Sequence, residues 1–127
     1  MTTMMKAVGF SESKTIDEEN SLYEFEMAVP EVGETDLLVK VSAVSVNPVD
    51  AKIRVRAAMQ KALESPRVLG FDAVGEVVSV GSKVTNFTEG DRVYYAGDVT
   101  RPGTNAQYHA VDSRIVARAP KGLNDAE

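Results

Sequence analysis

The sequence contains no cysteine, no tryptophan and a single histidine, His109, among its 127 residues. Without cysteine the chain can form no disulfide, no thiolate nucleophile, no Cys-ligated zinc site and no iron–sulfur cluster. One histidine leaves few ligands for a His-based metal site. These absences predict a protein of a reducing compartment that works without a protein-bound metal.

Basic residues and long apolar runs are also scarce. Fourteen Lys and Arg residues against 19 Asp and Glu give a formal net charge of -5 at pH 7, whereas affinity for nucleic acid depends on clustered basic side chains. No apolar run approaches the roughly 18 residues that span a bilayer. Residues 1–6 show no charged region followed by a hydrophobic stretch, as a secretion signal requires. We therefore expect no nucleic-acid partner, no membrane association and a cytoplasmic location.

Valine is abundant, and it points to β-structure. The chain has 19 valines against six leucines and three isoleucines, and β-branched side chains suit a pleated, half-buried surface. The length fits one domain, which can bury roughly two-thirds of its extended-chain surface. The composition therefore favours a single, mainly β domain.

Short apolar or alternating segments separated by turn residues predict seven strands and one main helix. In residues 22–29, Tyr23, Phe25 and Met27 share one face while Glu24 and Glu26 share the other. This two-residue alternation is typical of a strand with one face exposed to solvent. Asn47 suits a helix cap and Pro48 the first helical position. The expected strands cover 4–10, 22–29, 36–46, 73–80, 92–95, 106–111 and 115–119, and the expected helix lies within 51–64.

A sheet of such short strands has unpaired edge strands, and closure of the sheet into a barrel removes these edges. The predicted fold class is therefore mainly β (α+β), a partly open β-barrel with one or two short helices. Gly70, Gly75 and Gly81 do not have the G-x-G-x-x-G spacing of a dinucleotide-binding loop, and a strand rather than a helix follows them. We expect each of them to serve a turn, a bulge or a close backbone approach.

Three stretches carry the specific signal, in order along the chain: VSVNPVD at 44–50, LGFDAVGEV at 69–77, and FTEGDRVY at 87–94. With these motifs, residues 4 to about 122 resemble the N-terminal half of the medium-chain dehydrogenase/reductase family. The resemblance implies a GroES-like β-barrel over residues 1–127. In the complete enzymes of that family this barrel packs against a C-terminal Rossmann domain that binds NAD(P), and we expect that domain to be absent from this chain.

The resemblance also bears on whether the protein binds zinc. The zinc alcohol dehydrogenases of the family carry Cys where this sequence has Asn47, and a His-Glu pair where it has Phe71-Asp72. An Asn amide and a phenyl ring cannot replace a thiolate and an imidazole on zinc. The Asn-Pro-x-Asp pattern is similar to the zinc-independent quinone oxidoreductase and enone reductase branch, including its alcohol-dehydrogenase-like relatives. We expect no zinc.

That branch implies a function for the complete protein. NADPH or NADH would give hydride to a quinone or an α,β-unsaturated carbonyl, and the barrel would form the substrate-binding half of the oxidoreductase. The chain alone would be inactive, because the cofactor would be bound mainly by the absent domain. The resemblance implies a homodimer for the complete enzyme. The alternative is a stand-alone, non-catalytic GroES-like module for binding or oligomerisation, as in the co-chaperonins, although the loop at 97–105 is polar.

By resemblance, Asn47 and Tyr95 are the candidate catalytic residues. Asn47 would hydrogen-bond near the nicotinamide or the substrate oxygen, and Tyr95 would donate to a carbonyl from the rim of the cleft. Asn47, Asp50 and Arg54 are the candidate cofactor-binding residues, with Arg54 facing a phosphate. Each also has a structural interpretation: a helix cap for Asn47, first-turn helix charge for Asp50, surface charge for Arg54 and barrel packing for Tyr95. His109 is expected to be an ordinary surface histidine.

Overall fold

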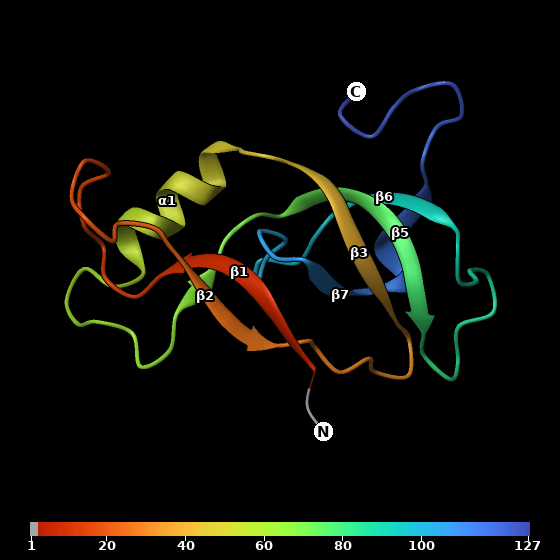
Figure 1. Cartoon of the computed structure of the whole chain (residues 1–127), viewed down its shortest axis with the longest axis horizontal. Coiled ribbons are helices and arrows are strands. Elements are labelled where there is room, and N and C mark those ends of the chain that lie inside the picture. The colour runs from red at the N-terminus through yellow and green to blue at the C-terminus, as the bar shows by residue number, and fades with distance from the viewer. Residues whose placement is uncertain (1–2) are drawn as a thin grey trace.

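The computed structural model describes residues 3–127 and consists of two antiparallel sheets and one α-helix (Figure 1). The smaller sheet has the order β2-β1-β4 and contains β1 (Met4–Phe10), β2 (Tyr23–Ala28) and β4 (Arg67–Val68). The larger sheet has the order β7-β3-β5-β6-β8 and contains β3 (Asp36–Ser45), β5 (Asp72–Val80), β6 (Arg92–Ala96), β7 (Tyr108–Asp112) and β8 (Val116–Arg118). Helix α1 (Pro48–Arg56) follows β3, and the 3-10 turn η1 (Ser113–Ile115) joins β7 to β8. The predicted mainly β fold is confirmed.

The two sheets meet along one short seam, where β1 runs beside residues 105–107. The backbone N–H of Val8 donates to the carbonyl of Asn105 at 2.8 Å, and the N–H of Gln107 donates to the carbonyl of Lys6 at 3.1 Å. Ala7 and Ala106 form an isolated bridge between these two bonds. The barrel is therefore closed here by a few bonds and is partly open, as predicted.

Two apolar cores stabilise the barrel. The main core lies inside the larger sheet and comprises Leu37, Val39, Ala73, Val77, Phe87, Val93, Tyr95 and Val111. A second cluster joins Phe10, Ala58, Leu69 and Phe71, against which Val49 and Ile53 of α1 pack. Because burial of apolar surface is the main favourable term in folding, this second cluster holds α1 against the end of the barrel.

Most of the predicted strands are found within one or two residues of their expected bounds, and the alternation in β2 holds, with Tyr23, Phe25 and Met27 half-buried on one face. The helix differs: α1 spans Pro48–Arg56, so it begins and ends earlier than the predicted 51–64. After it, the N–H of Ala58 donates to the Ser13 hydroxyl and the N–H of Leu63 donates to the Ser11 carbonyl. Tertiary bonds to the loop after β1 thus replace the helical ones. Across residues 3–127 no helix has the length and apolar character needed to cross a bilayer.

Gly75, the glycine of β5, has a structural role. A Cβ added at Gly75 would lie 2.2 Å from the carbonyl oxygen of Lys40 on the neighbouring strand β3. The β3–β5 register shifts close by, between Val41 and Ala43. Only glycine permits the two backbones to approach this closely, which confirms the expectation of a close approach rather than a dinucleotide loop.

We therefore expect Gly75→Ala to lower the free energy of unfolding by about 2 kcal/mol or more, because the added methyl meets backbone that cannot move freely. Urea denaturation followed by circular dichroism measures the change. Glu76→Ala, at the exposed neighbouring position of the same strand, is the control and should change stability by less than about 0.5 kcal/mol. Equal effects of the two substitutions would contradict the close-packing argument.

Candidate functional site

The motifs at 44–50 and 69–77 meet at one end of the larger sheet. Strand β3 ends at Ser45, the chain turns at Asn47, and α1 begins at Pro48. Strand β5 begins at Asp72, which pairs with Ser45 in the β3–β5 ladder. The sheet register therefore brings Asp72 to the turn that contains Asn47.

Ser45, Asn47 and Asp72 form a hydrogen-bonded triad. The Asn47 Nδ2 donates to Asp72 Oδ2 at 2.6 Å, and the Ser45 Oγ donates to the same oxygen at 2.9 Å. Nδ2 also lies 3.2 Å from Ser45 Oγ. An ionised carboxylate can only accept hydrogen bonds, so Asp72 fixes which end of the Asn47 amide faces it. The amide of Asn47 is thereby held in one orientation at the start of α1.

Asp50 is buried directly behind this triad, with only 6% of its surface exposed. Its Oδ2 accepts the backbone N–H of Asn47 and its Oδ1 accepts the backbone N–H of Gly70, both at 2.8 Å. Gly70 has a φ of 96°, which favours glycine. Asp50 therefore joins the first turn of α1 to the segment before β5. The structure gives it a positioning role, and the cofactor contact predicted for it stays a prediction.

Arg54 lies near the other end of α1, about 10 Å along the helix from Asn47 at 1.5 Å per residue. Its Nη1 donates to the carbonyl of Lys14 at 2.5 Å. The guanidinium thus holds the loop between β1 and β2, and no hydrogen bond joins it to the triad among residues 3–127. Its predicted phosphate contact remains a prediction.

Tyr95 and His109 form a buried pair inside the barrel, and the expectation of a surface histidine is wrong. His109 is 4% exposed because β7 places it on the inward face, opposite Val39 of β3. The Tyr95 hydroxyl and His109 Nδ1 are 2.8 Å apart and the rings stack at a centroid distance of 5.6 Å. Since His109 Nε2 lies 3.1 Å from the Pro102 carbonyl, Nε2 must carry the proton and Nδ1 accepts from Tyr95.

Burial sets the charge state of this pair. It raises the pKa of Tyr95 well above its usual range and lowers the pKa of His109 to about 4, an effect larger than the opposing one of the Pro102 carbonyl. Both side chains are therefore neutral at pH 7. The Tyr95 hydroxyl proton is used within the barrel, so barrel packing, the structural interpretation of Tyr95, describes its contacts here, while its donation to a substrate carbonyl remains a prediction.

The loop at 97–105 is held to the segment that leads into β5. The N–H groups of Gly103, Thr104 and Asn105 donate to the carbonyls of Val68, Gly70 and Leu69 at 2.7–3.0 Å. The hydroxyl of Thr104, which is fully buried, lies 3.2 Å from the carbonyl of Asp72. The loop thus fixes the start of β5 from one side while Asp50 fixes it from the other.

Asp72, Ser45 and His109 are the residues that sequence reasoning missed as parts of a polar network. For Asp72 a signal existed, because it occupies the second position of the pair that carries zinc ligands in part of the family. For Ser45 and His109 the sequence offered none. Strand pairing brings Ser45 to Asp72, and His109 reaches Tyr95 across the interior of the barrel, because β6 and β7 are not neighbouring strands.

The site does not match a zinc centre. Among residues 3–127 no group of three or more His, Cys, Asp or Glu side chains is arranged to hold a metal ion. The Asn47 nitrogen is an amide donor, and Phe71 is buried in the cluster beside α1. Neither side chain is one of the thiolate, imidazole or carboxylate ligands that bind zinc in proteins.

Comparison with known proteins agrees with this fold. The family model of the alcohol dehydrogenase GroES-like domain matches residues 33–121. A zinc-type alcohol dehydrogenase-like protein of Staphylococcus aureus is 44% identical over 123 residues, which cover 97% of this chain and 36% of that protein. The 2-methylene-furan-3-one reductase of Solanum lycopersicum is 37% identical over 131 residues, covering 97% of this chain and 33% of that enzyme.

A solved structure shows the same architecture. The quinone oxidoreductase from Coxiella burnetii superposes with a TM-score of 0.83 at 27% identity, over 97% of this chain and 39% of that one. The fold and the matching family model together define a GroES-like barrel of the alcohol dehydrogenase domain type. The chain belongs to the family of alcohol dehydrogenase GroES-like domains, the N-terminal domain type of the medium-chain dehydrogenases/reductases. It spans about a third of the length of the curated relatives described above.

If Asp50 joins α1 to β5, its removal should destabilise the whole domain. We expect Asp50→Ala to lower the free energy of unfolding by about 2–4 kcal/mol, because the buried N–H of Gly70 loses a charged acceptor and the helix loses its cap. Urea denaturation measures the loss. Lys52→Ala, exposed on the same helix, is the control; a loss below about 1 kcal/mol for Asp50→Ala would contradict the role.

The buried His109 should make stability depend on pH. Its folded-state pKa of about 4 lies below the value of 6.5 for a free imidazole, so the contribution of the neutral ring is fully present above pH 6.5 and is lost as the pH falls towards 4. Integrated from pH 7 to pH 4, this amounts to about 2–3 kcal/mol. His109→Gln keeps a donor for Pro102 but cannot titrate, so its free energy of unfolding should fall by that much less over the same pH range. Parallel curves for the two proteins would show that His109 is not neutral in the fold.

Proposed function

We propose that this barrel is the substrate-binding half of a zinc-independent, NAD(P)H-dependent oxidoreductase that reduces quinones or α,β-unsaturated carbonyls. The observation that carries the proposal is the triad of Ser45, Asn47 and Asp72. By resemblance, Asn47 stands where zinc enzymes of the family carry Cys and Asp72 where they carry the Glu of a His-Glu pair, yet here the two side chains form an oriented amide and a carboxylate joined by hydrogen bonds. Two relatives support the substrate class by name, a furanone reductase and a quinone oxidoreductase.

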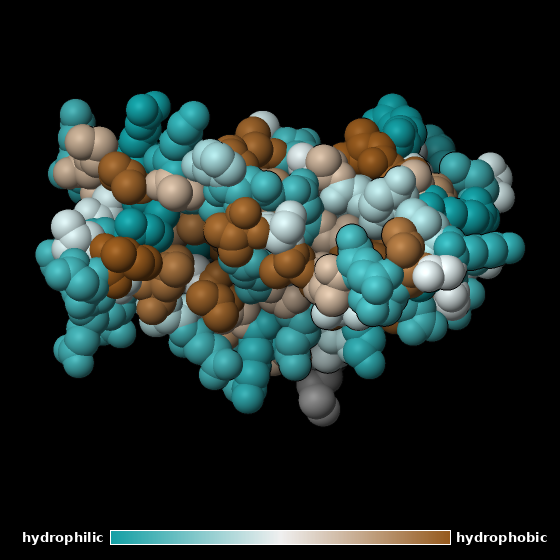
Figure 2. Space-filling model, turned by 90° about the horizontal axis from the view of Figure 1, so that it is seen from above, coloured by the Kyte–Doolittle hydropathy of each residue, from teal (hydrophilic) through white to brown (hydrophobic). Residues whose placement is uncertain are grey.

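An apolar surface next to the triad supports a role in binding. A cleft of about 490 Å³ includes Ser45 and Asp72 in its lining, together with Val44 and Tyr94. Val46, beside them in sequence, is 81% exposed. Figure 2 shows the face that carries α1 and the C-terminal tail, with apolar side chains spread across it between polar ones. A flat quinone or enone, and the domain that binds the nucleotide, would both cover apolar surface of this kind.

NAD(P)H would supply the hydride when it is bound. Residues 3–127 contain a single α-helix, and it connects β3 to β4 of the other sheet rather than joining two parallel strands of one sheet, so the dinucleotide would be held mainly by a C-terminal Rossmann domain. This chain's residues would do the rest. Asn47, kept in place by Asp72 and by the Asp50 bond to its backbone, would hydrogen-bond near the nicotinamide or the substrate oxygen. Val44 and Tyr94 would exclude water from the reacting groups.

No step of this proposal needs a strong acid, a strong base or a metal. Hydride addition to an electron-poor alkene or quinone places negative charge on oxygen, and oriented hydrogen bonds can stabilise that charge. Asp50, with both oxygens on backbone N–H groups, would act by positioning Asn47. In the complete enzyme we propose a homodimer, and the 127-residue chain would have no reductase activity by itself.

The first test is to recover from the source cells the polypeptide that contains the peptide 44–50 and to measure its intact mass. The proposal expects more than twice the 13.7 kDa of this chain, and it expects that protein to oxidise NADPH or NADH with a quinone or an enone. Activity should survive a chelator. A native species of 13.7 kDa would contradict the single-chain enzyme and favour a binding module, or a barrel that works with a separate nucleotide-binding subunit.

In the same protein Asn47→Ala should lower kcat/KM by about 10- to 100-fold, the range for one lost hydrogen bond near a developing charge. Asn86→Ala, an exposed asparagine in the turn before β6, is the matched control and should be unaffected. Inactivation by chelation with recovery on added zinc would contradict the metal-free mechanism.

A further inference from the structure

The barrel contains a second pocket, separate from the cleft beside the triad, at the place where its two sheets separate. It has a volume of about 210 Å³ and lies beyond the seam, between Met5 of β1, Met27 of β2 and the His109 region of β7. Asp36, at the first residue of β3, also lines it. Ser45 of the triad lies at the other end of β3, about 30 Å from Asp36 along a strand of ten residues, and the pocket shares no lining residue with the cleft beside the triad. The two sites are therefore distinct.

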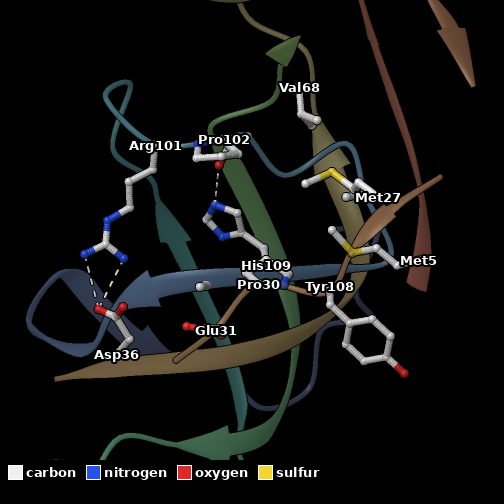
Figure 3. A pocket seen from close by; sticks show the side chains of 13 residues that line it. Met5, Met27, Pro30, Glu31, Asp36, Val68, Arg101, Pro102, Tyr108 and His109 are labelled. Carbon is white, nitrogen blue, oxygen red and sulfur yellow. Dashed lines mark hydrogen bonds and ion pairs between the residues drawn. The ribbon is translucent and has the colours of Figure 1, made fainter. Parts of the chain in front are cut away.

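The wall from the smaller sheet is apolar and adaptable. Figure 3 shows the side chains of Met5 and Met27 side by side at one side of the pocket, with Val68 above them. Met5 and Val68 are almost fully buried. Methionine side chains bend easily and fit irregular shapes, so this wall can accept an apolar group without displacing backbone.

The opposite wall is an ion pair. Arg101, on the loop at 97–105, places both terminal nitrogens 3.2 Å from the Asp36 Oδ1, and Figure 3 shows this pair facing the methionines across the pocket. A guanidinium has five N–H donors, so Arg101 retains donors beyond those that bind Asp36. His109 adds no free polar atom, because Tyr95 and Pro102 occupy both of its ring nitrogens.

The charges at the pocket favour an uncharged ligand. Arg101 is balanced by Asp36, His109 is neutral at pH 7, and Glu31 adds a negative charge to the lining. An anion would meet Glu31 without a free cation, and a cation would have to leave water for a wall of methionine and valine. A neutral molecule with one acceptor atom matches both walls.

The size of the pocket sets the size of the ligand. Voids larger than a water molecule are few in a well-packed protein, and a dry apolar cavity of about 150 Å³ already admits benzene. A pocket of about 210 Å³ therefore suits a somewhat larger body. We propose that it is a binding site for an uncharged molecule with an aromatic or compact aliphatic body of about nine non-hydrogen atoms and one oxygen acceptor that faces Arg101. The site is independent of the reductase function proposed above.

The methionines provide a direct test, because the chain has five of them and two line the pocket. The probes are acetophenone and isopropylbenzene, which share shape and size but differ in the carbonyl. In protein labelled with ¹³C at the methionine methyl groups, acetophenone should shift Met5 and Met27 saturably. The signal of Met59, which follows α1 and is 70% exposed, should not shift. Isopropylbenzene should bind about 10- to 150-fold more weakly, the range for losing one hydrogen bond to a charged donor.

Two variants and one control complete the experiment. Ala110→Leu reduces the volume at the pocket wall and should abolish the saturable shifts, while Ala57→Leu, at an exposed position after α1, should leave them unchanged. Arg101→Met should remove the preference for acetophenone over isopropylbenzene. Because this substitution leaves Asp36 without its partner, the amide spectrum of the variant must first show a folded barrel; the comparison of the two probes in the wild type needs no variant.

Shifts that stay linear in probe concentration, or that affect Met59 as much as Met5, would overturn the site. Unchanged binding in Ala110→Leu would overturn its location. Equal affinity for the two probes would overturn the role of Arg101 as donor. Shifts of the Ser45 and Asn47 backbone amides in place of the methionine signals would assign the probe to the triad cleft and would also overturn the proposal.

Discussion

The carboxylate of Asp50 is the contact on which the candidate site depends. One buried side chain accepts two backbone N–H groups, one at the first turn of α1 and one at Gly70 before β5. These segments are twenty residues apart and have no shared ladder of their own. With this link in place, the distance between Asn47 and Asp72 is set by the backbone rather than by flexible side chains, and a single orientation of the Asn47 amide follows. A hydrogen-bonded carboxylate thus makes this part of the site rigid.

A second polar element supports the same site from inside the barrel. Tyr95 of β6, His109 of β7 and the Pro102 carbonyl form one chain of hydrogen bonds that joins two strands and a loop across the core. The same loop bonds to the carbonyls of residues 68–70, so the start of β5 is held by polar contacts on both sides. Because every member of the chain is paired, its burial is compatible with neutral side chains and a stable core.

Local patterns predicted most of the fold, and non-local pairing accounts for what they missed. Alternation in 22–29 and the break at Asn47-Pro48 are properties of neighbouring residues, so the strand and the Asn47 cap were found, although the helix was placed three residues late. The helix end was not, because its last predicted turns are displaced by bonds to Ser11 and Ser13, some 45 residues earlier. His109 was misjudged for a related reason. The side of the sheet that a strand residue faces depends on how its strand pairs with the next. A single polar residue gives no alternation of polar and apolar positions from which that side could be predicted.

The seam between the sheets also affects how this domain folds during synthesis on the ribosome. Strand β1 precedes the other strands in the sequence, and β2 follows within about twenty residues to cover one of its edges. The other edge of β1 pairs with residues 105–107 through the Lys6–Gln107 and Val8–Asn105 hydrogen bonds, which join residues about a hundred positions apart. Until residue 107 has left the exit tunnel, that edge can be covered only at its end by β4. During synthesis the nascent domain therefore carries an open strand with exposed backbone donors and acceptors, the feature through which incomplete β-proteins pair with the wrong partner.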